Sequence, residues 1–152
     1  MAAGKTKALQ DRIDRVFALA DGCDDYEMKA ELACFIAVLT SGLIELSCRH
    51  FLYSYSSNRA RPEVVAYVES NLYFFQNAKA KRIQKLFGSF HRAFADRITS
   101  DLTEEEVAAI DSVVNNKNNL AHGANSGLGL ETMRSYYCCV LSALKKLQAT
   151  LR

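Results

Sequence analysis

Proline and glycine are scarce in this chain, which has one proline and seven glycines among its 152 residues. Turns between β-strands draw on both residues, so this scarcity argues against a sheet protein with many strands. Leucine, alanine, lysine and glutamate, which favour helices, are plentiful. The sequence therefore predicts an all-α fold.

The chain also lacks a long apolar run. Residues 1–14 are polar and show no signal peptide. The longest apolar stretch, residues 33–46, contains Thr40, Ser41 and Glu45 and is shorter than the roughly 20 residues that cross a bilayer. We therefore expect no membrane association and a cytoplasmic location.

The five cysteines include no Cys-x-x-Cys pair, which is typical of reduced thiols in the cytosol. Cys48 and His50 stand alone, without a second pair of ligands at a usable spacing for zinc. We therefore expect no metal site and no cofactor.

No sign of charge dominates, because 19 basic residues face 17 acidic ones. The charges are nevertheless segregated: residues 79–97 are basic, and residues 101–111 are acidic. The basic segment is a candidate RNA-binding surface, and the alternative is a solvated outer helix face. The residues that we expect to contact RNA are Lys79, Lys81, Arg82, Lys85 and Arg92.

Hydrophobic periodicity predicts one domain, residues 1–152, built as an up-and-down bundle of about five to six helices. A capping box at Thr103 and Glu106 marks the start of the fifth helix. In the last helix, apolar residues spaced by four and three, from Met133 to Leu151, face either the bundle or another chain. The helices are expected at residues 6–20, 25–55, 62–75, 78–98, 103–121 and 130–151.

The fifth helix has an unusual second half, because four of the five residues 115–119 are asparagine, a poor helix former. In a helix, Asn115, Asn119 and His122 share one face, which predicts a polar cleft, a subunit contact or a solvated helix end. Lys117 and His122 lie about 140° apart around such a helix. They converge only if the helix ends or bends near Ala121, or if the lysine side chain wraps around the helix.

This segment resembles the signature of the HEPN superfamily, an arginine followed four to six residues later by histidine. Here Lys117-Asn118-x-x-x-His122 stands in its place, with Lys117 where the family has arginine. The segments "NNLAHG", "LTEEEVAAIDSVV", "SGLIELSCRHFL" and "NAKAKRIQKLFGSF" are also similar to bacterial RiboL-PSP/MAE-type HEPN domains.

The resemblance implies metal-independent RNA cleavage, often by toxins of toxin–antitoxin or phage-defence systems, at a cleft shared by a homodimer. An antitoxin or another protein is then a possible partner. Family members with a degraded motif instead serve as binding or dimerisation modules, and this alternative stays open because lysine lacks the two-pronged phosphate grip of arginine.

The candidate catalytic residues are His122, Lys117 and Asn118. Histidine can take up and release a proton near neutral pH, Lys117 would stabilise charge on the phosphate, and Asn118 would position it. A two-fold dimer would supply a second histidine. The supporting residues are Asn119, Glu45 and Arg49. The spacing of Glu45 and Arg49 predicts a helix ion pair, and the resemblance implies that Glu45 lies beside the His122 segment and orients it.

Overall fold

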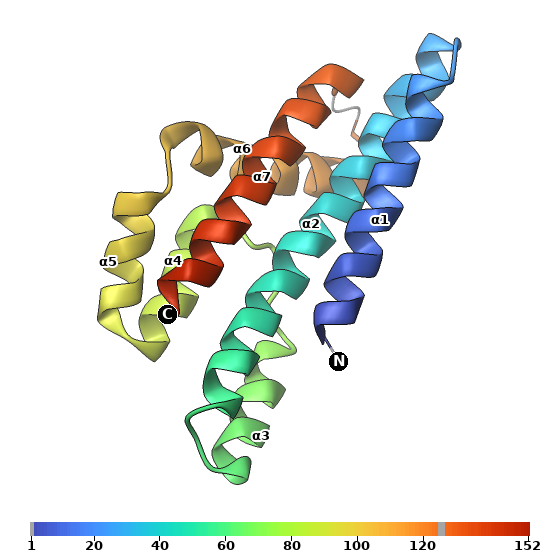
Figure 1. The fold of residues 1–152 in the computed structure, drawn as a ribbon. Helices are drawn as coiled ribbons and strands as arrows, with labels where there is room; N and C mark the ends of the chain where they lie inside the picture. Colours follow the sequence, from blue (N-terminus) through green and yellow to red (C-terminus); the bar gives the residue numbers. More distant parts are fainter. Residues whose placement is uncertain (1, 125–126) are drawn as a thin grey trace.

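The computed structural model describes residues 2–124 and 127–152 and is an all-α helical bundle with no strand in these ranges. Seven helices follow one another in the described part of the chain (Figure 1). They are α1 (Ala2–Asp21), α2 (Tyr26–Ser57), α3 (Pro62–Leu72), α4 (Ala80–Phe90), α5 (Arg92–Asp101), α6 (Glu104–Ala121) and α7 (Leu130–Thr150).

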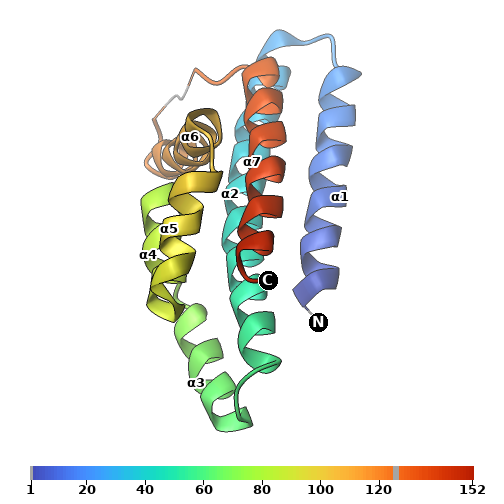
Figure 2. The same ribbon diagram turned by 60° about the vertical axis from the view of Figure 1, so that its left-hand side comes forward.

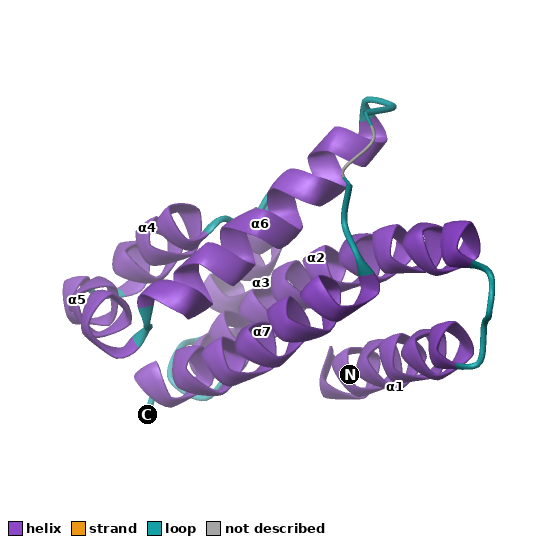
Figure 3. Ribbon diagram, turned by 90° about the horizontal axis from the view of Figure 1, so that it is seen from above, coloured by secondary structure: helices purple, strands orange, loops and turns teal. Residues whose placement is uncertain are grey.

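The long helix α2 is the centre of the bundle and packs against α1, α3, α6 and α7. Figure 2 shows α1, α2 and α7 aligned, with α7 running in the same direction as α2 and α1 running the opposite way. Helix α6 runs across this layer and is seen almost end-on in Figure 2, and the view from above shows it on the opposite side of α2 and α7 from α1 (Figure 3). This crossing allows α7 to return to the same end of the bundle at which α2 begins.

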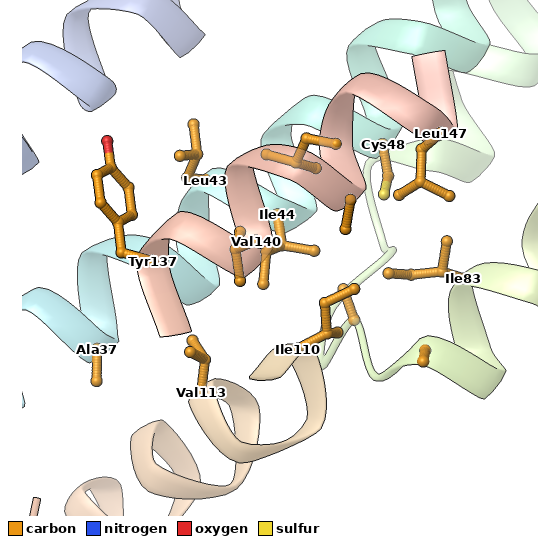
Figure 4. Packing of buried hydrophobic residues seen from close by; sticks show 14 of the residues in the cluster. Ala37, Leu43, Ile44, Cys48, Ile83, Ile110, Val113, Tyr137, Val140 and Leu147 are labelled. Carbon is orange, nitrogen blue, oxygen red and sulfur yellow. The ribbon is translucent and has the colours of Figure 1, made fainter. Parts of the chain in front are cut away.

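The core lies where α2, α4, α6 and α7 meet (Figure 4). Ile44, Ile83, Ile110 and Val140, one from each of these helices, are fully buried there. The apolar stripe of α7 from Met133 to Leu151 is likewise buried, so it faces the bundle and not another chain.

The helix expected at residues 78–98 is wrong as a single element, because the chain leaves the helical conformation at His91. Its φ and ψ angles are −160° and 130°, and its Nδ1 accepts a hydrogen bond from the Ala93 N–H at 3.1 Å. Helix α5 then folds back along α4, and a Cβ on Gly88 would lie 3.0 Å from that of Ala95. Phe90 and Phe94 are four residues apart and continue a helical pattern through the break, which explains the error.

The start of α6 has the predicted capping box. The Thr103 hydroxyl accepts from the Glu106 N–H, and the Glu106 carboxylate accepts from the Thr103 N–H at 2.9 Å. The same buried carboxylate accepts from Ser142 at 2.6 Å and from Lys146 at 2.9 Å. The capping box therefore also fastens α6 to α7.

Helix α2 is long and apolar enough to cross a membrane by length and composition alone. Half of the residues in its most apolar window are buried inside the bundle. The central helix of a water-soluble protein meets the same criterion, so the expectation of no membrane association stays a prediction.

Candidate functional site

Helix α6 continues through the asparagine-rich segment and ends at Ala121, as expected. Gly123 adopts a φ of 74°, and its N–H donates to the Leu120 carbonyl at 3.0 Å. The Ala124 N–H donates to the Asn119 carbonyl at 2.9 Å. This pair of bonds is a Schellman motif, which satisfies carbonyls that the helix end would otherwise leave unpaired.

His122 is the C-terminal cap of α6, and its side chain is exposed. Within the described part of the chain, its backbone N–H bonds to α6, whereas its imidazole forms no hydrogen bond. Asn115 and Asn119 are exposed as well, and Asn118 is half-buried. The end of α6 therefore presents an amide-rich face that carries an accessible imidazole.

Lys117 points in another direction, because it continues the stripe of buried Ile110 and Val113 toward the interior. Its half-buried side chain donates a hydrogen bond from Nζ to the Asn77 Oδ1 at 3.0 Å. Helix α6 is regular up to Ala121 and ends there, but the bond to Asn77 holds the Lys117 side chain on the inner side of α6, about 140° around the helix axis from His122. No hydrogen bond joins the side chains of Lys117 and His122 in the described part of the chain.

Asn77 joins Lys117 to the other predicted polar pair. Its backbone N–H donates to the Glu45 Oε1 at 2.8 Å, and the Glu45 Oε2 lies 3.5 Å from the Arg49 guanidinium. The helix ion pair between Glu45 and Arg49 is thus confirmed. Glu45 is linked through Asn77 to Lys117, five residues before His122.

Sequence reasoning missed Asn77 as a site residue. It has a φ of 53° and is the only non-glycine residue with a positive φ in the described ranges. Asparagine adopts this left-handed conformation more readily than most residues, which is a usable but weak signal between two predicted helices. Nothing in the neighbouring sequence predicts that Asn77 bonds to Glu45 and Lys117, which are distant in the chain.

The predicted RNA-binding residues are all exposed, and none of them forms an ion pair with a described residue. Lys79 is the N-cap of α4, and Lys81, Arg82 and Lys85 lie within that helix, whereas Arg92 follows the break at His91. Arg92 lies about 16 Å from the start of α4, the length of that 11-residue helix. The single basic helix face that was expected is therefore divided.

An open groove of about 980 Å³ adjoins the end of α6 and lies between the beginnings of α2 and α7. Leu120 and Gly123 line it, together with the acidic residues Glu27, Glu31 and Glu131 and the single basic residue Lys29. Three carboxylates against one ammonium group disfavour a polyanion, so this groove is not a suitable path for RNA.

The cysteine and histidine residues of α2 do not form a ligand set. Burial, with a further contribution from Glu45, raises the pKa of the Cys48 thiol to about 12. No cluster of three or more His, Cys, Asp or Glu side chains that could hold a metal ion occurs among the residues that the structure describes.

Comparisons of the chain with protein-family models, curated proteins and solved structures gave no match. The fold and the site define a helical-bundle protein with an exposed histidine at the end of a crossing helix. Any function must therefore be argued from the residues of this chain and their geometry.

Proposed function

We propose that this protein is a metal-independent endoribonuclease of the HEPN type that acts as a homodimer. The observation that carries the proposal is the imidazole of His122 on the amide face at the end of α6, which is exposed and bonds to no described residue. The exposed basic residues at the start of α4 support it, because Asp111 of α6 accepts from the Ala80 N–H at 2.8 Å and brings the two helices together.

The reaction uses the 2′-hydroxyl of the RNA as the nucleophile. His122 of one subunit removes the hydroxyl proton, the 2′-oxygen bonds to phosphorus, and the bond from phosphorus to the 5′-oxygen breaks. His122 of the partner subunit donates a proton to the departing 5′-oxygen. The products carry a 2′,3′-cyclic phosphate and a 5′-hydroxyl, and a two-fold axis near the end of α6 supplies both histidines.

Lys117 has a different role in this proposal from the one that the motif suggests. Its ammonium group has three N–H donors, and one of them is used by Asn77. A direct phosphate contact at His122 requires this bond to break, since the two side chains point apart. We therefore propose that the main role of Lys117 is structural: its hydrogen bond holds α6 against the connection between α3 and α4.

The experiment that tests the activity is incubation of the purified protein with total RNA and tRNA in excess EDTA. We expect cleavage by the wild-type protein and none by His122→Ala. Lys5→Ala changes an exposed residue of α1, away from this face, and serves as the control, with cleavage retained. Absence of cleavage by the wild-type protein at every concentration would overturn the proposal.

The hydrogen bond between Lys117 and Asn77 favours a second candidate, a catalytically inactive module that dimerises and binds RNA or a protein such as an antitoxin. In this case Lys117 is purely structural. RNA binding at low salt without cleavage identifies an RNA-binding module. If the protein neither binds nor cleaves RNA, the module binds a protein partner instead.

A further inference from the structure

Three aromatic side chains project into solvent from α3 and the turn that follows it. Tyr67 and Tyr73 are each 70% exposed, and Phe74 is 74% exposed. The helical turn continues past Leu72, so Tyr67 and Phe74, seven residues apart, share one outward face. The rings of Tyr73 and Phe74 pack edge to face with centroids 5.4 Å apart. A patch of exposed rings, unlike a single exposed ring, is typical of binding surfaces.

The segment of the chain that contains these rings carries an excess of positive charge. Residues 59–85 contain six basic residues and only two acidic ones, and none of the six forms an ion pair with a described residue. The Arg82 guanidinium lies 5.8 Å from the ring of Phe75, which joins the basic part of α4 to the aromatic turn. Figure 2 shows α3 leading into the α4–α5 pair along one edge of the molecule.

The basic residues also stand where they do not help the fold. Lys79, Lys81 and Arg82 crowd the N-terminus of α4, whose first turn contains no acidic residue, and the Asp111 carboxylate that accepts from the Ala80 N–H offsets only part of their charge. Positive charge at a helix N-terminus opposes the helix dipole. A local arrangement that costs stability is expected where a ligand needs it.

We propose that this aromatic–basic surface, formed by Tyr67, Tyr73, Phe74, Lys79, Lys81, Arg82 and Lys85, binds single-stranded RNA. Unpaired bases stack on Tyr73 and Phe74, and the phosphates contact the basic residues. Base faces are inaccessible in a duplex, so the surface selects unpaired segments. A protein partner fits less well, because protein interfaces are depleted in lysine, and three of the four basic residues here are lysines.

That the ligand is RNA rests on the proposed function. The further inference adds the route by which the RNA strand reaches His122. Asp111, which holds the start of α4, is eleven residues before His122 on α6, or about 16 Å along the helix axis. A strand bound to the surface therefore starts within a few nucleotides of the imidazole.

The test measures binding in the His122→Ala background, so that cleavage plays no part. The probes are a fluorescent oligouridylate of twelve nucleotides and an RNA duplex of twelve base pairs. We expect the double variant Tyr73→Ser/Phe74→Ser to lose at least about tenfold in affinity for the single strand and little for the duplex. Tyr26→Ser changes a ring that is 85% exposed at the start of α2 and leaves both affinities unchanged.

A second variant tests the charges. Lys81→Gln/Lys85→Gln should weaken the binding of both probes. Because two phosphate contacts are lost, the slope of log affinity against log salt concentration should become shallower by about 1.4 for the single strand. The proposal is overturned if no probe binds at low salt or if Tyr73→Ser/Phe74→Ser keeps its single-strand affinity. Loss of dimers from that variant with RNA binding intact would instead assign the rings to a protein contact. Wild-type protein that binds the single strand but cleaves nothing contradicts only the proposed nuclease activity.

Discussion

Lys117 is the residue at which the sequence motif and the structure differ most. The motif pairs it with His122, whereas the fold directs it inward to Asn77. The direction follows from helical geometry alone, because Lys117 lies seven residues after Ile110 on the buried stripe. The partner does not follow from the sequence, because Asn77 is forty residues away and is brought near by the packing of α6 against the start of α4.

We predict that Lys117 and Asn77 are energetically coupled. The variants Asn77→Gly, which tolerates the φ of 53°, and Lys117→Met should each lower the free energy of unfolding. Their double variant should cost about 1 kcal/mol less than the sum, the range of a half-buried charged hydrogen bond. Urea unfolding of the four proteins measures this coupling.

A matched cycle provides the control. Asn119 is an exposed asparagine near Lys117, and Asn119→Gly combined with Lys117→Met should be additive. Strict additivity in the Asn77 cycle as well would contradict the structural role of Lys117.

The lowered pKa of Glu106 should make the free energy of unfolding depend on pH. Burial favours its neutral form, but hydrogen bonds from Ser142, Lys146 and the Thr103 backbone outweigh this effect and hold the pKa of the carboxyl below its ordinary value of 4.5. A carboxyl with a lowered pKa in the folded state stabilises the fold above its unfolded pKa. This contribution is lost as the pH falls through the lower folded value.

We therefore expect Glu106→Gln to lower the free energy of unfolding at pH 7 by about 2 kcal/mol. The difference from the wild type should shrink below about pH 4. Glu105→Gln, at an exposed position of the same turn, should cost less than about 1 kcal/mol. Urea unfolding at several pH values gives the comparison, and a pH-independent effect of Glu106→Gln would count against the charged network.

Among the helices, local signals placed most elements and failed at one. The capping box, the glycine after α6 and Pro62 at the start of α3 mark helix ends, because each acts through the residues beside it. The break at His91 has no such signal, since neither proline nor glycine occupies it. It depends on the close packing of α5 on α4 at Gly88 and Ala95, a contact between residues that the pattern placed on one continuous helix.

The contact at Gly88 yields a prediction for the α4–α5 pair. Gly88→Val places a branched side chain where a Cβ alone lies 3.0 Å from that of Ala95. The melting temperature should fall, because the free energy of unfolding decreases by about 2 kcal/mol. Ala95→Gly should recover part of the loss when it is combined with Gly88→Val, although alone it destabilises α5 by about 1 kcal/mol. A continuous helix through His91 would give no such rescue, because positions 88 and 95 would then lie about two turns apart.

For the whole molecule, composition and periodicity predicted the all-α bundle, whereas the sequence could not place α6 across the α2 layer. That placement depends on which faces pack together, and it leaves Asn115, Asn119 and His122 of the amide face exposed in the described part of the chain. The proposed active unit is therefore a pair of molecules joined near this face.

A shared cleft makes a quantitative prediction about mixed dimers. When wild-type protein and His122→Ala are unfolded together in equal amounts and refolded, about one quarter of the dimers contain His122 in both subunits. We expect RNA cleavage to fall to about this fraction of the activity of undiluted wild type. Activity of about one half would show that each subunit cleaves alone, and a monomeric mass in light scattering would remove the shared cleft.

The most direct test of the central claim, that His122 drives cleavage through the 2′-hydroxyl of the RNA, is mass spectrometry of the product ends in excess EDTA. A defined single-stranded RNA should yield fragments ending in a 2′,3′-cyclic phosphate and beginning with a 5′-hydroxyl. A 2′-deoxy substitution before the cut should block cleavage there, and His122→Ala should give no fragments. Intact RNA with the wild-type protein, fragments with a 5′-phosphate, or the same fragments from His122→Ala would contradict the claim.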